Sequence, residues 1–276
     1  MLRTATALAL STHPGPAVAV TAIAVILGAG IGLDPGRLIL LGVAFLANQA
    51  SVGLSNDWID ADRDRAVGRT DKPVAAGRVG VGTVRTAAFV TAVAALLLTI
   101  PLGWPATAAH AVFIGSAWAY NAGLKSTVLS VLPYIVSFGL LPVVVTLSRE
   151  APAGASPWAI VAGALLGVAA HIANVLPDLD DDRATGVRGL PHRLGVRASG
   201  VVIAVALAGA SLSIVLGLGG AGPLHYLGLA ASLLLAAACA VLVLRGTVTR
   251  AVFRIIIAAA LVDVVLLASS GVRLLV

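Results

Sequence analysis

Long runs of apolar residues separated by short polar turns make up most of this 276-residue chain. A membrane-spanning helix needs about 20 consecutive, mostly apolar residues. The runs are rich in Ala, Leu and Val and lack the short alternating segments of a transmembrane β-barrel. We therefore predict an all-α integral membrane protein with nine transmembrane helices in one bundle, at residues 15–33, 36–57, 83–101, 104–121, 127–148, 157–177, 198–219, 223–244 and 250–272.

The composition agrees with this prediction and leaves little material for a soluble domain. Apolar residues make up 59% of the chain, charged residues only 11%, and the mean hydropathy is +1.03, whereas soluble domains average about 25% charged residues. We expect a single transmembrane domain over residues 1–276, with a central cavity that opens to the loops. The lone Cys239 excludes a disulfide within the chain.

The basic residues follow the predicted membrane topology. Of the 18 Lys and Arg residues, 15 fall on the side of the N-terminus, and only Arg37, Arg149 and Arg273 fall on the other. This asymmetry places the N-terminus in the cytoplasm, and it accounts for the pI of about 10.4 without nucleic acid as a partner. We expect a multi-pass protein of a bacterial plasma membrane, with its active site facing the cytoplasm.

One short pattern occurs twice on this cytoplasmic side, each time where an apolar run ends. Asn56-Asp60-Asp64 and Asn174-Asp178-Asp182 both read Asn-x3-Asp-x3-Asp, and a spacing of four places the three side chains on one helix face. The repeat suggests two related halves, 1–126 and 127–249, followed by an extra helix at 250–276. Eight of the chain's 12 acidic residues lie in these two stretches: Asp57, Asp60, Asp62, Asp64, Asp178, Asp180, Asp181 and Asp182.

So many neighbouring carboxylates repel one another unless a cation lies between them. Their hard oxygen ligands suit Mg²⁺, which commonly binds through one or two carboxylates together with substrate phosphates. Nearby cations can take the remaining phosphate charge; they are Arg69, Lys72, Lys125, Arg183 and Arg188. A diphosphate with an apolar tail fits this arrangement, and its departure would leave an allylic cation in a dry bundle interior.

Both motifs resemble those of the UbiA superfamily of intramembrane prenyltransferases. NDWIDADRD is similar to the family's first motif, and PDLDDDRATGVRGLPHRLG is similar to its second. The resemblance covers essentially the whole chain. It implies Mg²⁺-dependent transfer of a prenyl group from an isoprenoid diphosphate to a small-molecule acceptor, commonly aromatic, within the lipid bilayer.

The resemblance also implies roles for individual residues. Catalysis would depend on Asp60 and Asp178, and Asn56 and Asn174 would orient the motif or the diphosphate. Tyr120 in WAYNAGLK resembles a family tyrosine that lines the prenyl or acceptor pocket. The metal ligands would be Asp57, Asp60, Asp64, Asp178 and Asp182, and the phosphate ligands would include Arg69, Lys72 and Lys125.

The sequence departs from the family pattern at three places. Val175 follows Asn174 where many members have Asp, so we expect Asp181 to join the second set of metal ligands. Lys72-Pro73 replaces an Arg-Pro pair, which keeps the charge but loses the bidentate fork. His13 lies where members that prenylate aromatic acids carry Arg, and we expect it to line the prenyl or acceptor pocket. A neutral phenol, a lipid alcohol or no acceptor therefore stays open, and the last case describes a terpene cyclase of the same superfamily.

Three polar residues within the spans have two readings each. His171 and Asn48 lie on the faces of the two motifs, and each either lines the prenyl or acceptor pocket or hydrogen-bonds inside the core. Asp263 lies deep in the last span, where we expect a hydroxyl or Arg254 as its partner rather than a part in catalysis.

Overall fold

The computed structural model describes the chain except for residues 1, 180–181, 183–185 and 246–249. Within the described ranges the regular structure is helical, apart from one isolated antiparallel bridge between Ala155 and Leu275. The predicted all-α fold is therefore confirmed. The longer helices are α1 (Leu2–Ser11), α2 (Pro14–Gly30), α3 (Pro35–Ile59), α5 (Val81–Thr99), α6 (Trp104–Ala122), α7 (Leu132–Leu147), α8 (Pro157–Val175), α10 (Leu190–Gly217), α11 (Pro223–Leu244) and α12 (Arg250–Ser269).

Each predicted segment overlaps one long helix, but the count of nine spans is not confirmed. Among the described residues, six helices are long and apolar enough to cross a membrane, or up to seven if the bent pair α1–α2 forms one span. Neither α6 nor α12 is among the six. His110 and Asn121 reduce the apolar character of α6.

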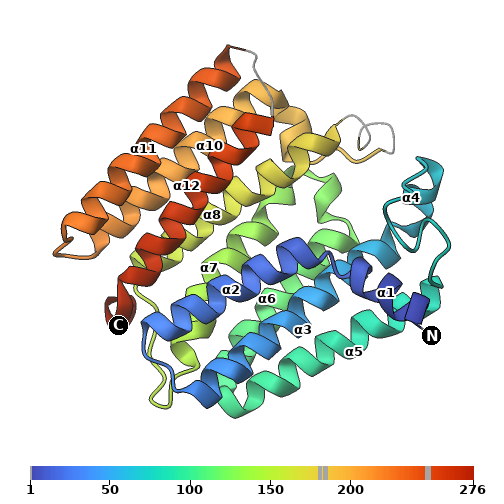
Figure 1. The fold of residues 1–276 in the computed structure, drawn as a ribbon, viewed down its shortest axis with the longest axis horizontal. Helices are drawn as coiled ribbons and strands as arrows, with labels where there is room; N and C mark the ends of the chain where they lie inside the picture. Colours follow the sequence, from blue (N-terminus) through green and yellow to red (C-terminus); the bar gives the residue numbers. More distant parts are fainter. Residues whose placement is uncertain (1, 180–181, 183–185, 246–249) are drawn as a thin grey trace.

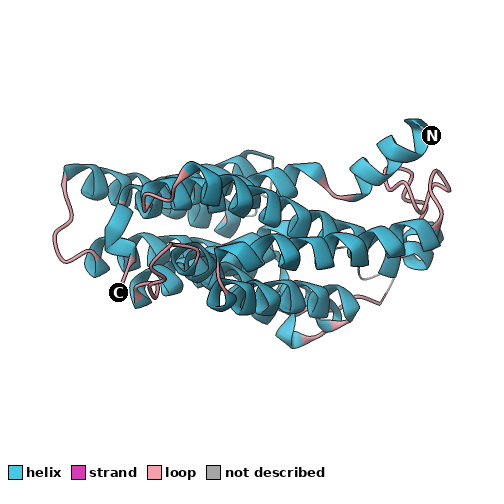
Figure 2. Ribbon diagram, turned by 90° about the horizontal axis from the view of Figure 1, so that it is seen from below, coloured by secondary structure: helices cyan, strands magenta, loops and turns pink. Residues whose placement is uncertain are grey.

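The helices pack as two groups that meet at α7 and α8 (Figure 1). On one side, α3 packs against α2 and α5, and on the other side α10 packs against α8 and α11. α7 contacts both α6 and α8 and thereby joins the two groups. Figure 2 shows most helices running in similar directions, with α1 projecting at one end.

Glycines let α7 and α8 approach closely. A Cβ atom on Gly163 would lie 2.4 Å from the carbonyl oxygen of Phe138, and one on Gly167 would lie 2.4 Å from that of Tyr134. Such contacts exclude any side chain, which is how small residues bring membrane helices together. This close contact between α7 and α8 places Tyr134 of α7 against Gly167 of α8.

Both motif regions lie at helix ends, as predicted. α3 ends at Ile59 and is followed at once by the short α4 (Ala61–Ala66), while α8 ends at Val175 and continues into a single 3₁₀ turn, η4 (Leu176–Asp178). α10 (Leu190–Gly217) begins eight residues before the predicted span at 198. Its first turns precede a kink at Gly195, and the predicted span covers only the part after the kink. Gly195 has a φ of 73°, which glycine adopts without the steric cost that other residues pay. The predicted duplication into halves stays a prediction.

Candidate active site

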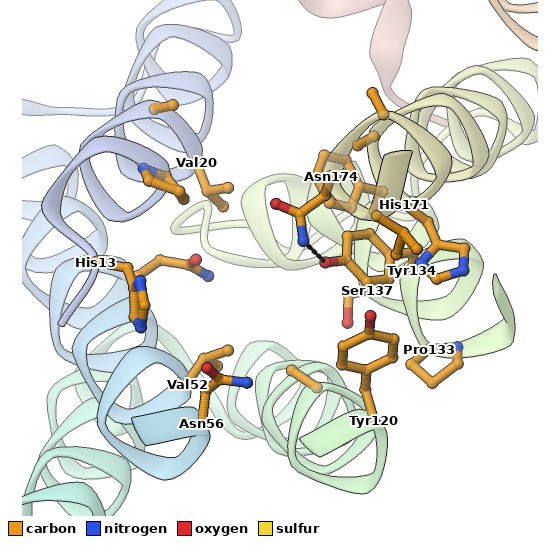
Figure 3. Close-up of a pocket in the computed structure, with 18 of the residues that line it drawn as sticks. His13, Val20, Val52, Asn56, Tyr120, Pro133, Tyr134, Ser137, His171 and Asn174 are labelled. Carbon is orange, nitrogen blue, oxygen red and sulfur yellow. Dashed lines mark hydrogen bonds between the residues drawn. The ribbon is translucent and has the colours of Figure 1, made fainter. Parts of the chain in front are cut away.

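A cavity of about 660 Å³ opens beside the first motif and extends into the bundle. Its walls come from α2, α3, α6, α7, α8 and α12, and from the loops after α3 and α6. Figure 3 shows His13, Val52 and Asn56 on one side of the cavity, facing Tyr120, Tyr134 and Asn174 on the other. Polar side chains gather at the motif end, and apolar ones line the rest.

The three carboxylates of the first motif are almost completely buried. Asp57, Asp60 and Asp64 have exposed fractions of 1%, 4% and 3%. The break between α3 and α4 does not disturb their spacing, because the amide of Asp60 donates to the carbonyl of Asn56 (2.9 Å) and that of Asp64 donates to Asp60 (2.8 Å). The predicted shared face of Asn56, Asp60 and Asp64 therefore continues across the helix boundary.

Each of these carboxylates has basic partners. Lys72 Nζ lies 2.9 Å from Asp64 and 3.4 Å from Asp57. Arg63 binds Asp60 at 2.9 Å, and Lys125 forms a second ion pair with Asp60. Burying three acids together is costly unless each is paired and hydrogen-bonded, and these cations meet that requirement.

Asn56 connects the acids to the bases. Its amide nitrogen donates to Asp60 (3.0 Å), and its amide oxygen accepts a hydrogen bond from Lys72 (3.0 Å). Burial lowers the pKa of Lys125 below its ordinary value, although the nearby Asp60 carboxylate acts in the opposite direction. The mouth of the cavity is thus a compact network of alternating charge.

His13 completes the network from the N-terminal side. Its Nε2 lies 2.9 Å from Asp57, and its φ of 53° makes it the one non-glycine residue with positive φ in the described part of the chain. This conformation forms the bend between α1 and α2, and it is held because a Cβ on Gly53 would lie 2.4 Å from the carbonyl oxygen of Thr12. A tight backbone contact therefore seats His13 against Asp57.

The second motif contributes fewer described side chains. Asn174 lines the cavity and donates to Tyr134 Oη at 3.5 Å. Asp182 also lines it, with His192 Nε2 at 3.4 Å. Asp181 and Arg183 lie outside the described residues, as does the side chain of Asp178. A Cβ on Gly189 would lie 2.5 Å from the carbonyl oxygen of Lys125, so the loop after the second motif touches the lysine that serves the first.

Two predicted phosphate ligands differ in position. Arg69 lines the cavity, where its guanidinium binds both oxygens of Asp71 at 2.9 Å. This fork lowers the pKa of Asp71 to about 2. Arg188 is exposed and does not line the cavity.

The structure also decides between pocket lining and core hydrogen bonding for His171 and Asn48. His171 lines the cavity while its Nε2 contacts Ser130 Oγ at 3.0 Å, so it is both hydrogen-bonded and at the wall. Its ring packs against those of Tyr120 and Tyr134. Asn48 is not among the lining residues; it is fully buried and contacts His110 Nε2 at 2.9 Å. The core reading applies to Asn48.

Four of the polar or charged lining residues that sequence reasoning missed are Arg63, Asn121, Tyr134 and His192. Arg63 follows Asp60 by three positions, which is ion-pair spacing on a helix, and this signal could have found it. Asn121 adjoins Tyr120 and bonds Asn56 at 3.4 Å. Tyr134 and His192 carry no local signal, because packing of α7 on α8 and the second loop places them.

No group of three or more His, Cys, Asp or Glu residues poised to hold a metal occurs among the described residues. The first motif nonetheless fits a hard cation, since the donor set is carboxylate oxygen. Oδ2 of Asp57 is also buried with no hydrogen-bond partner in the described part of the chain, and a buried carboxylate oxygen left in this way is a ready ligand.

Fold and site together define a helical membrane protein whose apolar cavity ends in an acidic, ion-paired mouth. Residues 17–269 match the sequence profile of the UbiA prenyltransferase family, and the chain belongs to that family. Its members are multi-pass integral membrane proteins. A comparison with curated protein sequences finds no match.

Solved structures of the family share the fold over nearly the whole chain. A UbiA homologue from Archaeoglobus fulgidus bound to GPP and Mg²⁺ is 14% identical, with a TM-score of 0.67 and coverage of 98% of this chain and 97% of that one. An apo UbiA homologue from Aeropyrum pernix K1 is 18% identical, with a TM-score of 0.69 and coverage of 95% and 97%. A structure of digeranylgeranylglyceryl phosphate synthase is 18% identical, with a TM-score of 0.72 and coverage of 99% of both chains.

Proposed function

We propose that this protein is a Mg²⁺-dependent prenyltransferase that ionises an isoprenoid diphosphate and transfers the prenyl group to a small-molecule acceptor, aromatic or lipid. One observation carries the proposal. Three buried carboxylates and their basic partners close one end of an apolar cavity in a chain of this family. The A. fulgidus homologue with GPP and Mg²⁺ supports it, since that protein binds both components.

The residues divide into two binding functions. Asp57, Asp60 and Asp64 would hold Mg²⁺ from the first motif, and Asp178, Asp181 and Asp182 from the second, with Asp60 and Asp178 essential for catalysis. Bound Mg²⁺ supplies charge neutralisation for the departing diphosphate. The diphosphate would be bound by Asn56, Arg69, Lys72, Lys125, Asn174 and Arg183. Arg188 is left out of this set because it does not line the cavity.

Lys72 and Lys125 are suited to an exchange of partners. In the structure both neutralise carboxylates. If metal ions were bound by those carboxylates, the two ammonium groups would be free to bind phosphate oxygens at the cavity mouth. Asn56 contacts Asp60 and Lys72 at once, so it can keep both in register during the exchange.

The reaction breaks the bond between C1 of the prenyl group and the bridging oxygen, and both electrons leave with the diphosphate. The acceptor then forms a bond to C1 and loses a proton. The apolar walls exclude water from the cation in the interval. Tyr120 and His171 line the cavity beside the mouth, and Tyr120 presents a π face that stabilises positive charge. His13 faces them from the bend between α1 and α2, as Figure 3 shows.

The orientation belongs to the same proposal. The mouth would face the cytoplasm, by our proposal that of a bacterial cell, and the basic loops at the motif end support this orientation through the positive-inside rule. The donor diphosphate would then enter from the aqueous side, and its prenyl chain would extend into the apolar part of the cavity.

The test is diphosphate release by purified full-length protein in lipid nanodiscs, given C5 to C20 prenyl diphosphates, Mg²⁺ and a panel of phenols, quinols and lipid alcohols. We expect release that needs both Mg²⁺ and an acceptor, with a prenylated acceptor found by mass spectrometry. Asp60→Asn should lower turnover at least about 100-fold, the scale of one lost electrostatic group at an active site. Asp62→Asn is the matched control, because Asp62 lies two residues away with its side chain 96% exposed. Equal turnover in both variants, or a cyclised product without acceptor, would contradict the proposal.

A further inference from the structure

The cavity is much longer than its polar mouth. Beyond the motif end, the lining becomes apolar and continues to Leu27 on α2, Pro142 on α7, Gly163 on α8 and Leu267 on α12. No charged side chain lines this far part among the described residues. An apolar channel of this kind suits a hydrocarbon tail.

Helix geometry gives the depth of the apolar part. Lining residues run from Pro16 to Leu27 on α2 and from Ile256 to Leu267 on α12, a rise of about 16 Å along each helix at 1.5 Å per residue. On α8 they run in the opposite direction, from Asn174 at the mouth to Gly163, again over about 16 Å. The lining residues of α2, α8 and α12 therefore all give a cavity depth of about 16 Å.

An isoprene unit adds four carbon–carbon bonds of about 1.5 Å to the chain, or about 5 Å when extended. A C5 chain would fill about a third of the apolar length, whereas a C15 chain spans about 15 Å and reaches the end. A short donor would leave the deep part of the cavity without contacts, which a close-packed interior does not favour.

We propose that the donor is a prenyl diphosphate of three isoprene units, and that Val20 and Val264 lie at two graded depths along its binding channel. This inference rests on the proposed function of the site. Val20 lies about 6 Å below Pro16, and Val264 about 12 Å below Ile256. Both line the cavity, and Figure 3 shows Val20 at its wall.

The chain offers a matched control for each residue. Val18 and Val265 are neighbours on the same two helices, but they are 60% and 57% exposed on the outside of the bundle and do not line the cavity. A bulky side chain at either control position would project into lipid. Substitutions at the paired positions therefore differ in whether they obstruct the cavity.

The experiment measures binding of C5, C10, C15 and C20 prenyl S-thiolodiphosphates with Mg²⁺ to the full-length protein in nanodiscs, by calorimetry. Sulfur replaces the bridging oxygen in these probes, which lets them bind without ionising. We expect the Kd to fall about tenfold per isoprene unit from C5 to C15, from burial of apolar carbon. Val264→Trp should remove the gain from the third unit onward, and Val20→Trp should remove the gain from the second.

Val18→Trp and Val265→Trp should leave all four affinities unchanged, and they correct for partition of long probes into the lipid. Val264→Phe repeats the test with a smaller side chain. Tight binding that does not depend on chain length, or equal effects of Val264→Trp and Val265→Trp, would overturn this inference and leave the proposed function standing. Absence of binding by every probe would overturn both.

Discussion

Buried carboxylates occur in two regions of this membrane protein, and their surroundings are opposite. At the cavity mouth, Asp57, Asp60 and Asp64 lie among Lys72, Lys125 and other bases. In the group of α10, α11 and α12, Asp263 is fully buried and accepts a hydrogen bond from the hydroxyl of Ser211 rather than pairing with a base. The sequence expectation of a hydroxyl partner for Asp263 is confirmed.

The difference separates two uses of the same side chain. Under the proposed function, acids that face cations around a cavity would bind metal ions, while the cations would bind the diphosphate. An acid that contacts a hydroxyl between packed helices has no cavity to serve, since Asp263 does not line the one described above. Burial alone therefore does not identify a functional carboxylate in a membrane; the partners and the open space beside it do.

The largest effect should follow from removing the shared base at the mouth. Lys72→Met leaves Asp57 and Asp64 without their common cation, and breaking a buried ion pair costs about 3–5 kcal/mol. We expect a large loss of thermal stability together with loss of diphosphate release, both partly restored in Lys72→Arg. Arg65→Met is the control, because Arg65 pairs with the exposed Asp62, and such surface pairs contribute about 0–1 kcal/mol. Equal thermal stability of the two Met variants would contradict the assignment.

A smaller effect, on stability alone, is expected at Asp263. Asp263→Leu leaves the Ser211 hydroxyl unpaired in the core, which costs about 1–3 kcal/mol. Asp263→Asn keeps a hydrogen-bonding group and should cost less. Thermal unfolding in nanodiscs measures both, and diphosphate release at a permissive temperature should stay within about twofold of the unaltered protein. A large loss of release in well-folded Asp263→Asn would place this acid in the reaction and break the comparison.

The smallest effect is expected at Asp71. This acid pairs with a base, as the acids at the mouth do, but it is exposed. Its pKa is lowered to about 2 by the hydrogen bonds from Arg69, with burial opposing. A carboxylate with a lowered folded-state pKa contributes stability above its unfolded pKa, near 3.8, and loses it as the pH falls toward 2. Asp71→Asn should therefore change nothing in the pH dependence of stability between about pH 5 and 8. It should alter the KM for the diphosphate by a few-fold at most, since Arg69 is freed from an exposed pair.

Much of the site was predictable, because helix periodicity and charge are local properties. The spacing of Asn56, Asp60 and Asp64 predicts one face, and the end of an apolar run predicts its place at the membrane surface. Arg69, Lys72 and Lys125 follow from charge next to the motifs, and all three line the cavity. The family resemblance rests on the same local residues.

The rest depends on contacts between distant segments. Asn48 faces His110 rather than the cavity because α3 packs against α6 at that level, which spacing within α3 does not reveal. Tyr134 reaches Asn174 because glycines on α8 admit the backbone of α7. Such positions follow from which helices adjoin, and a single sequence does not record that.

The ion pairs at the mouth also set an order of assembly. Asp60 finds one partner in Lys125, 65 residues later in the chain, and Asp57 finds another in Lys72. Lys72 precedes α5 in the chain, whereas Lys125 follows α6. The ion pair between Asp60 and Lys125 can therefore form only after both helices have been synthesised. Completion of this end of the bundle is then a late event in biogenesis. Slow insertion of α5 or α6 would leave Asp60 without Lys125 and the cavity mouth incomplete.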